Sequence, residues 1–417
     1  MNDPINIFIL VISYFIILLI VSYITGKDDS NNNFFTGNRN SKWYVVAFGM
    51  VGTSLSGVTF ISVPGWIQES NFTYLQVVIG YLFGYFAVAF LLLPIYYKNN
   101  VTSIYEYLGK RFGRNSHKVG ALFFFISRAL GASFRLFLVA IVLQEFIFKK
   151  WSVPFEITVI FSVFLIWIYT NRGGIKTIIW TDTFQTTLMI FAVFLTISDI
   201  ADNLEISVFN FLEINEIKKY TKVFVFDSPL ERNYFLKSFI GGFFITICMT
   251  GMDQDMMQKN LTCKNEEDAK KNMIVFSFIL FIVTFLFMFL GALLYAYAEK
   301  ENISVPMIDG NANTDLLFPK IALEGGLGNG VAVTFILGLI AAAYSSADSA
   351  LTSLTTSFCV DFLDTQKLEM GIQKKVRKKV HFFMGLLIVL IVISFKYFLS
   401  KNVIDGLLTA AGYTYGP

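Results

Sequence analysis

Charged residues are scarce in this chain: Asp, Glu, Lys and Arg make up 15% of its 417 residues, whereas soluble chains are nearer a quarter charged. Hydrophobic residues account for 55%, and the mean hydropathy is +0.61. The basic residues are spread over loops and leave a net charge of only +3, which lacks the dense basic stripe of a nucleic-acid-binding surface. The composition indicates a polytopic membrane protein that is surrounded by the lipid bilayer and has no nucleic-acid partner.

Cysteine and histidine are also rare. The three cysteines, Cys248, Cys263 and Cys359, lie apart in the sequence and indicate neither a disulfide framework nor a zinc site. The two histidines, His117 and His381, lie at loop edges and do not form a metal-binding pair. The sequence contains no phosphate-binding loop and no nucleophile elbow. We therefore expect no enzymatic activity, no organic cofactor and no obligate protein partner.

Long apolar runs take up most of the chain. The first, Ile5 to Ile24, is long enough to cross about 30 Å of hydrocarbon at ~1.5 Å per residue. It lacks the basic start and cleavage site of a signal peptide, so we expect a retained helix over residues 4–26. Further spans are predicted at 43–68, 74–97, 119–148, 153–169, 175–200, 235–257, 273–298, 327–362 and 381–399, followed by a run from Val403 that the end of the chain cuts off.

Basic residues are distributed unevenly between the two sets of loops. With the N-terminus outside, the inside loops contain most of the Lys and Arg residues, including the cluster at 374–379. The outside loops then contain roughly half as many, and positive charge favours the inside. We therefore predict an integral protein of the plasma (inner) membrane with its N-terminus outside.

One predicted span contains hydroxyl groups and a carboxylate. In the stretch 338–356, Ala342, Ser345, Ser346 and Ser349 recur at helical spacing on one face, with Asp348 at its edge. A carboxylate near the bilayer centre costs roughly 2.5 to 3.5 kcal/mol on insertion scales, so Asp348 indicates an ion or substrate path. Such a face can present several oxygen atoms to one small cation.

Two of the predicted spans look interrupted. Interrupted helices at matching places in two halves of a chain point to a transporter binding site, because unwound backbone frees carbonyls and helix ends for ligands. Without the first helix, each interrupted span would open a five-helix repeat. For either span alone, the simpler explanation that glycine is common in membrane helices stays open. The interrupting residues are Gly49, Gly52, Gly57, Pro64 and Gly65 in the span 43–68, and Gly241, Gly242 and Gly251 in the span 235–257.

Four separated segments resemble the solute:sodium symporter family: Thr102–Gly113, Arg172–Gln185, Gly251–Leu261 and Ala341–Leu354. The resemblance runs from about Phe35 to Pro417. It implies an all-α polytopic membrane protein with the inverted five-plus-five helix repeat of the LeuT fold and an extra N-terminal helix. The implied organisation is a single transporter domain over residues 1–417, with the extra helix at 4–26, the first repeat at 43–200 and the second at 235–417. Since 412–417 resembles the middle of the last core helix of the family, we expect the chain to end within that helix and the second repeat to be incomplete at its C-terminal end. The alternative is that the sequence is a fragment.

The resemblance implies sodium as the coupling ion and a shared sodium site. Matched by motif, its ligands are the backbone carbonyls of Gly52, Leu55 and Ala342 and the hydroxyls of Ser345 and Ser346. The step from Gly52 to Leu55 suits carbonyls exposed where a helix unwinds, and the step from Ala342 to the two serines is one helical turn. The alternative is that the serines bond back to carbonyls four residues earlier.

Some members of the family, including a sialic acid transporter, hold a second sodium ion at an aspartate that matches Asp182. Here that candidate site comprises Asp182, Ser345, Asp348 and Ser349. Asp182 lies about seven residues into its span, roughly 10 Å along the helix axis. The alternative is an interfacial carboxylate that caps a loop or pairs with Lys176. For Asp348, the roles of proton carrier and arginine partner also stay open.

Arg128 and Arg135 are seven residues apart and therefore project from nearly the same face of one helix. The resemblance matches Arg135 with the arginine that holds the substrate carboxylate in the sialic acid transporter, and a bidentate guanidinium suits that group. Either arginine could instead pair with Asp182, Asp348 or a carbonyl as internal scaffolding. The implied substrate-binding residues are Ser54, Ser56, Thr59, Arg135 and Phe243, and Phe60 and Phe244 are the gating candidates.

The predicted function is secondary active uptake of a small polar solute, driven by the sodium gradient through alternating access. The match at Arg135 favours a carboxylate such as sialic acid, and a neutral sugar or amino acid is the alternative substrate. Two other classes stay open: a non-transporting membrane sensor or scaffold of the same fold, and a passive channel.

Overall fold

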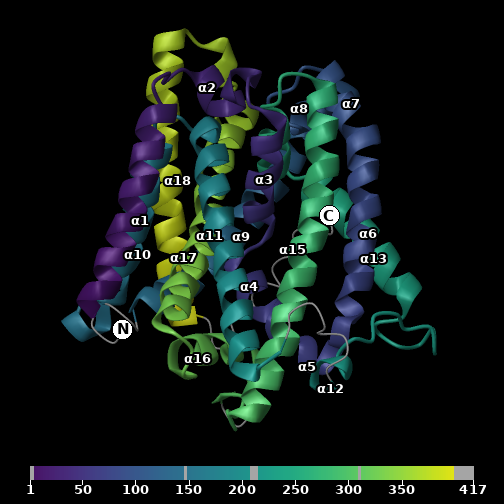
Figure 1. Ribbon diagram of the computed structural model, residues 1–417. Helices are drawn as coiled ribbons and strands as arrows, with labels where there is room; N and C mark the ends of the chain where they lie inside the picture. The colour runs from purple at the N-terminus through teal and green to yellow at the C-terminus, as the bar shows by residue number, and fades with distance from the viewer. Residues whose placement is uncertain (1–3, 145–147, 207–214, 309–310, 399–417) are drawn as a thin grey trace.

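The structure is almost entirely helical. It is a computed structural model that describes residues 4–144, 148–206, 215–308 and 311–398. The long helices lie side by side and run roughly along one direction, as Figure 1 shows. The only strands among the described residues are β1 (Met307–Ile308) and β2 (Asn311–Ala312), which pair antiparallel. The predicted all-α class is confirmed, and the predicted run from Val403 lies outside the described residues.

In the first half of the chain, the helices form where the apolar runs predict them. Some extend further, because a helix can continue past the apolar stretch that lies in hydrocarbon: the span predicted at 119–148 begins at Arg114. The helices are α1 (Pro4–Thr25), α2 (Asn31–Thr36), α3 (Trp43–Ser54), α4 (Gly57–Gly65), α5 (Ile67–Ser70), α6 (Tyr74–Ala87), α7 (Leu93–Lys98), α8 (Tyr105–Phe112), α9 (Arg114–Leu143), α10 (Phe155–Thr170) and α11 (Ile175–Leu204).

The second half follows the same pattern. The span predicted at 273–298 begins earlier, at Glu266, because Asn265 caps the helix by accepting a hydrogen bond from the Asp268 amide at 2.8 Å. Its first turn is acidic, which suits the positive end of the helix dipole. The helices are α12 (Asn215–Lys218), α13 (Phe235–Thr246), α14 (Gln254–Asn260), α15 (Glu266–Lys300), α16 (Leu317–Glu324), α17 (Asn329–Ser357) and α18 (Met370–Phe398).

Membrane-crossing length is reached by most of the spans that the sequence predicts. Among the described residues, seven helices are long and apolar enough to cross a membrane, and two bent helix pairs pass the same test together. α10 is a shorter apolar helix. These elements correspond to the predicted complete spans.

Both predicted interruptions are present. The first separates α3 from α4 with a bend of 64°. Leu55 is extended at the break, and Ser56 caps α4 by accepting a hydrogen bond from the Thr59 amide. The second separates α13, which continues as a π-helical turn, η7 (Ile247–Gly251), from α14 with a bend of 72°. The chain thus changes direction at the first and the sixth core spans, as the sequence predicts.

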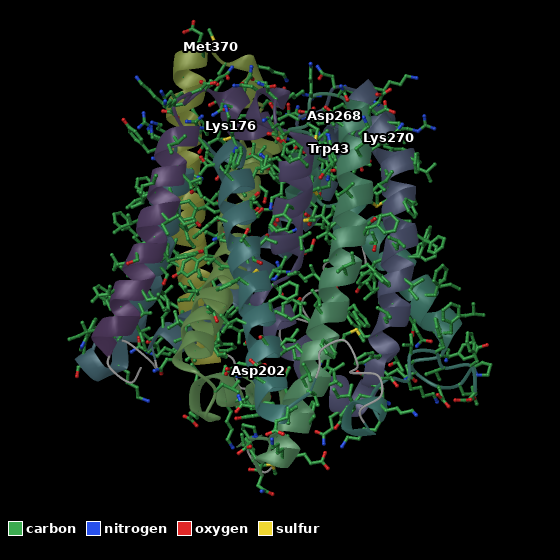
Figure 2. All side chains as sticks on the ribbon, in the orientation of Figure 1. Trp43, Lys176, Asp202, Asp268, Lys270 and Met370 are labelled. Carbon is green, nitrogen blue, oxygen red and sulfur yellow. The ribbon has the colours of Figure 1, made fainter. Side chains whose placement is uncertain are left out.

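The two ends of the bundle differ in charge. Figure 2 shows Lys176, Asp268, Lys270 and Met370 at one end and Asp202 at the opposite end. We call the first the basic end, because the basic cluster 374–379 follows Met370 there. The N-terminus lies at the same end as Asp202 (Figure 1). The basic loops and the N-terminus thus lie at opposite ends of the bundle, as the sequence predicts. The side of the membrane that each end faces stays a prediction.

α17 occupies the centre of the bundle. In its apolar window 78% of the residues are buried, against 33% for α1, which lies at the periphery. α17 packs against α11, and α3 packs against α11 in turn. The polar stretch of the sequence is therefore surrounded by protein and not by lipid, which is the arrangement that intramembrane polar groups require.

Candidate ion and solute site

Asp182 on α11 is the point where three helices meet. It is fully buried. Its Oδ1 accepts a hydrogen bond from the Ser345 hydroxyl on α17 at 2.6 Å, and its Oδ2 accepts one from the Thr53 hydroxyl on α3 at 2.9 Å. The structure therefore brings Asp182 and Ser345 together, as the sequence predicts, and adds Thr53 to the set.

A lysine completes the surroundings of Asp182. The Nζ atom of Lys259 lies 2.6 Å from Asp182 Oδ2 and also contacts the Thr53 hydroxyl. Lys259 is on α14, which is buried throughout, and its side chain is 1% exposed. The sequence predicts that Lys259 lies in an inside loop after the span 235–257. That prediction is wrong, because α14 turns back into the bundle after the second break. The alternative of an interfacial Asp182 paired with Lys176 is also wrong.

The residues of the predicted shared sodium site lie beside this point. α3 ends at Ser54, and the Leu55 amide donates to the Val51 carbonyl at 2.8 Å. The carbonyls that follow Val51 are in the last turn of a helix, where carbonyls lack intrahelical donors. An added Cβ at Gly52 would lie 2.2 Å from the Thr186 hydroxyl oxygen, so only glycine lets α3 approach α11 this closely.

On α17, the two serines of the predicted shared site behave differently. The Ser346 hydroxyl donates to the Ala342 carbonyl at 3.3 Å, as the back-bonding alternative describes. The Ser345 hydroxyl donates to Asp182, which leaves its oxygen lone pairs available for a cation. Carbonyl and hydroxyl oxygens suit a hard cation such as sodium, so the donor set of the shared site fits the ion. Its five members stay predicted ligands.

The other members of the predicted second sodium site have separate partners. Asp348 accepts a hydrogen bond from the Tyr169 hydroxyl at 2.7 Å through Oδ2. Its Oδ1 accepts none from the described residues. The Ser349 hydroxyl donates to Asp255 Oδ1. The four oxygen-bearing side chains are therefore neighbours in the bundle, but their hydrogen bonds go to different partners. Ser345 bonds to Asp182, Asp348 bonds to Tyr169, and Ser349 bonds to Asp255.

Arg128 lies in a buried ion-pair cluster. Its guanidinium contacts Asp253, and it lies 3.3 Å from Asp255. All three side chains are at most 6% exposed. Asp253 also caps α14 by accepting a hydrogen bond from the Met256 amide at 3.1 Å. The structure thus pairs Arg128 with two carboxylates that the scaffolding alternative does not name, and a scaffolding role stays a prediction.

Arg135 lies on α9, which packs against α4. It is half-buried, and it is close enough to Asp255 for their charges to attract. Ser56 and Thr59 are at the start of α4, where the capping hydrogen bond is 3.4 Å long. The guanidinium of Arg135 is therefore on a helix that packs against α4. Phe243 is half-buried on α13, which packs against α6.

The two gating candidates lie in different surroundings. Phe60 is fully buried, and its ring centroid lies 5.6, 5.4 and 5.7 Å from those of Phe287, Phe318 and Phe335. It joins α4 to α15 and α17. Phe244 is 58% exposed on α13. Gating by either residue stays a prediction.

The family follows from the sequence as a whole. The model of the sodium:solute symporter family matches residues 34–416. The chain belongs to the sodium:solute symporter family. Members of this family are integral membrane transporters and not enzymes. The match covers both interrupted helix pairs and every residue of the predicted ion sites.

Several relatives are sodium-coupled transporters by name. The sodium/sialic acid symporter NanT of Aliivibrio fischeri is 27% identical over 87% of this chain and 70% of its own length. Sodium-coupled monocarboxylate transporter 2 is 26% identical in Danio rerio and 25% in Homo sapiens, over 80% and 81% of this chain. The chain spans about half of these two transporters, 53% and 54% of their length.

Solved structures of transporters show the same fold. A substrate-bound, outward-open sodium-coupled sialic acid symporter matches with a TM-score of 0.82 at 24% identity, over 98% of this chain and 84% of its own. MHP1, a nucleobase-cation-symport-1 family transporter in a closed conformation, matches with a TM-score of 0.54 at 14% identity, over 92% and 77%. The predicted LeuT-like fold of the symporter is confirmed.

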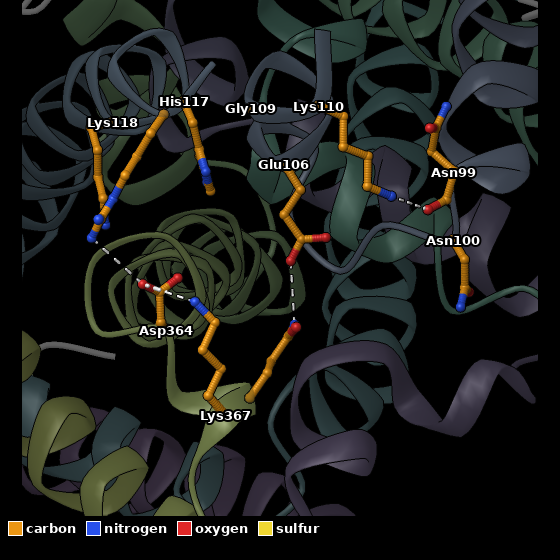
Figure 3. Close-up of a pocket in the computed structure, with 11 residues that line it drawn as sticks. Asn99, Asn100, Glu106, Gly109, Lys110, His117, Lys118, Asp364 and Lys367 are labelled. Atoms are coloured by element: carbon orange, nitrogen blue, oxygen red, sulfur yellow. Dashed lines mark hydrogen bonds and ion pairs between the residues drawn. The ribbon is translucent and has the colours of Figure 1, made fainter. Parts of the chain in front are cut away.

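A polar cavity lies at the basic end of this symporter, apart from the ion site. Its volume is about 630 Å³, and its lining includes Glu106, His117 and Lys367 (Figure 3). Neither Asp182 nor Ser345 lines it. A second cavity of about 510 Å³ between the α2 region and Gln373 is at the same end. Both cavities open the basic end to solvent but do not reach the residues that the sequence predicts for sodium.

Sequence reasoning missed several functional candidates: Thr53, Lys259, Tyr169 and Asp255. Lys259 and Asp255 lie inside the segment Gly251–Leu261 that carries the family resemblance. The charged residues in that segment follow directly after a predicted break, and this position could have indicated that they are part of the buried site. Thr53 and Tyr169 gave none, because a single hydroxyl in a membrane helix is most often bonded within its own helix.

Proposed function

We propose that this symporter couples inward sodium movement to the uptake of a small solute that carries a carboxylate, by alternating access around a site near the middle of the bundle. The observation that carries the proposal is the convergence of the end of α3, Asp182 on α11 and Ser345 on α17 at one buried point. Broken-helix ends and a polar face of a packed helix are the materials from which transporters build midplane ion sites.

Sodium would bind between the break after α3 and the polar face of α17. The shared-site carbonyls of Gly52, Leu55 and Ala342 and the hydroxyls of Ser345 and Ser346 would hold it. A sodium ion bound there would connect the bent pair α3 and α4 to α17. It would therefore stabilise the conformation in which these helices are close together. Each positive charge that crosses with the field gains roughly 2.3 kcal/mol per 100 mV, which can be used to accumulate solute.

A carboxylate is the substrate class that the geometry favours. α4 begins at the first break, so the positive end of its dipole and its free amides lie there. Arg135 lies on the neighbouring helix α9, and Ser54, Ser56 and Thr59 supply polar groups. The sialic acid and monocarboxylate transporters among the relatives act on carboxylates by name. A neutral sugar or amino acid is the alternative.

We also propose an orientation in the membrane and a division of the chain into repeats. The basic end would face the cytoplasm across the plasma membrane, and the N-terminus would be outside, because positive charge is favoured on the inside. Residues 4–26 would form the extra helix, 43–200 the first repeat and 235–417 the second.

Uptake into proteoliposomes tests the function. A sodium gradient should drive accumulation of at least one of sialic acid, lactate, proline and glucose. Ser345→Ala combined with Ser346→Ala should reduce sodium-driven uptake by about tenfold or more, which corresponds to a loss of roughly 1.4 kcal/mol of binding free energy per factor of ten. Ser353→Ala is the matched control, since the Ser353 hydroxyl bonds only within α17, to the Ala350 carbonyl at 3.1 Å.

The outcomes separate the candidate functions. Unchanged sodium dependence in the double serine variant would show that the shared-site assignment is wrong. Uptake at a rate that does not depend on the sodium gradient would indicate a passive channel. Sodium binding without any uptake would favour the sensor or scaffold.

The same assay tests the substrate class. Arg135→Ala should abolish uptake of the carboxylate substrate, and Arg135→Lys should retain part of it because the charge stays while the bidentate geometry is lost. A wild-type preference for glucose over both carboxylates would refute the carboxylate proposal and leave sodium coupling intact.

A further inference from the structure

Asp182 already has a cation. Its Oδ2 lies 2.6 Å from the ammonium nitrogen of Lys259, and both side chains are almost fully buried. We propose that the ammonium group of Lys259 takes the place of a second sodium ion at Asp182, so that this chain couples transport to one sodium ion, held at the shared site. The proposal rests on the proposed function for the sodium ion that remains.

Both oxygens of the Asp182 carboxylate already accept hydrogen bonds, and the ammonium group lies on one of them. Ser345 donates to Oδ1, while Thr53 and Lys259 both approach Oδ2. A sodium ion at Oδ2 would lie within a few ångströms of the ammonium group, and two like charges at that distance repel strongly in a buried site. The ion could enter only if the ammonium group left.

The other two side chains of the predicted second site make hydrogen bonds to other groups, although Asp348 Oδ1 accepts none from the described residues. The Ser349 hydroxyl donates to Asp255, and Asp255 in turn lies 3.3 Å from Arg128. Asp348 accepts from Tyr169. Ser345 and Asp182 are the two of the four side chains that bond to each other, and the ammonium group of Lys259 lies beside them. With that ammonium group in place, the residues present do not fit a second sodium ion.

Lys259 can act as a fixed cation because of how α14 is positioned. After the bend that follows η7, every residue of α14 is buried. Asp348 is also close enough to interact electrostatically with Lys259 as well as with Asp182. One tethered positive charge thus attracts two buried carboxylates, and it stays in place whatever the sodium concentration. The hydrogen bond to Asp182 also orients the Ser345 hydroxyl, whose lone pairs stay available to the shared site.

A count of bound sodium tests the proposal without any solute. Equilibrium binding of ²²Na⁺ to the purified chain in detergent should saturate at one ion per chain. Lys259→Gln should raise the count twofold, to two ions, because it removes the ammonium and leaves the Asp182 carboxylate. Lys259→Arg keeps a cation and should stay at one. The matched control is Lys259→Gln combined with Asp182→Asn, which removes both charges and should also bind one ion.

Each outcome decides the matter. Two ions on the wild-type chain, or one ion on a folded Lys259→Gln variant, would overturn the role of Lys259 while leaving the proposed function standing. No sodium bound to the wild type would overturn the proposed function together with this inference. If Lys259→Gln does not fold, Lys259→Met also removes the ammonium group and keeps the Asp182 carboxylate, so it should bind two ions in its place.

Discussion

At the scale of single residues, two buried glutamines of the segment Gly251–Leu261 make hydrogen bonds to other helices and loops. Gln254 accepts a hydrogen bond from the Ile104 amide at 2.8 Å and donates to the Thr102 carbonyl at 3.0 Å. Gln258 donates to the Phe35 carbonyl and to the Thr356 hydroxyl, both at 2.8 Å. An unpaired polar group is costly away from water. The conspicuous polar residues of the segment Gly251–Leu261 therefore include structural links between helices.

The loss of Arg128 should cost stability while it leaves the five predicted ligands of the shared sodium site in place. Arg128→Met leaves Asp253 and Asp255 as buried carboxylates without their cation, so we expect a loss of about 3 to 5 kcal/mol. Thermal unfolding of the purified protein in detergent, followed by size-exclusion chromatography, measures it. Arg114→Met is the control: its side chain is 79% exposed and 3.9 Å from Asp364, so its loss should cost less than about 1 kcal/mol. Equal effects would contradict the buried cluster.

At the scale of elements, each break is stabilised by contacts from its surroundings. The carbonyls of Gly251 and Met252 at the second break accept hydrogen bonds from the hydroxyls of Tyr96 at 2.9 Å and Tyr105 at 3.1 Å. At the first break, Ser56 caps α4. Because these partners satisfy the freed backbone groups, irregular backbone is tolerated inside the membrane-spanning region.

The packing of α13 on α6 depends on glycine at a close approach. A Cβ at Gly242 would lie 2.2 Å from the Val77 carbonyl oxygen, which is backbone and cannot move aside cheaply. Gly242→Ala should therefore separate the two helices and cost about 1 to 3 kcal/mol or more.

The neighbouring glycine provides the control for this contact. No atom lies within 4 Å of a Cβ at Gly241, so Gly241→Ala should be neutral or stabilise by about 0.5 to 1 kcal/mol. Melting temperatures of both variants in the same detergent check the prediction. A destabilised Gly241→Ala variant with an unaffected Gly242→Ala variant would contradict the observed packing.

At the scale of the whole molecule, the N-terminal part is fastened to α18 at the basic end. Asp29, between α1 and α2, lies 2.8 Å from the Nζ atom of Lys374 and 2.9 Å from that of Lys378, and it also contacts Arg377. Partial burial would raise the pKa of Asp29, but hydrogen bonds from Lys374 and Lys378 and the nearby Arg377 outweigh it and lower the pKa to about 2. These ion pairs connect the first described helix to the last.

The lowered pKa gives this connection a defined pH dependence. Unfolded Asp titrates near pH ~3.9, so the ion pairs should stabilise the fold fully above about pH 5 and lose their effect as the pH falls toward 2. Asp29→Asn should cost about 1 to 2 kcal/mol at pH 7, a value reduced because water reaches part of the group.

The measurement is the difference in melting temperature between wild type and Asp29→Asn at several pH values. The difference should be constant from pH 8 to 5 and shrink below about pH 4. Asp28→Asn, in the same loop, is the control, because its exposed carboxylate bonds to Ser30 and Asn38 and not to α18. A difference that vanishes already at pH 6 would contradict the assignment.

The sequence by itself determined the helices and their two interruptions. In a bilayer a chain must satisfy its backbone hydrogen bonds locally, so apolar runs become helices wherever they are long enough, and glycine-rich stretches mark where they bend. The resemblance to the symporter family, and not local structure, predicted that Ser345 and Asp182 would be neighbours.

Only the tertiary structure decided what Asp182 pairs with. Lys259 is 77 residues away in the chain, and by sequence it follows a span and precedes a charged loop, as a cytoplasmic lysine would. The bend of 72° before α14 turns that lysine into the interior. Whether a buried carboxylate meets a sodium ion or an ammonium group depends on how separate helices pack, because a charge acts through distance in space and not along the sequence.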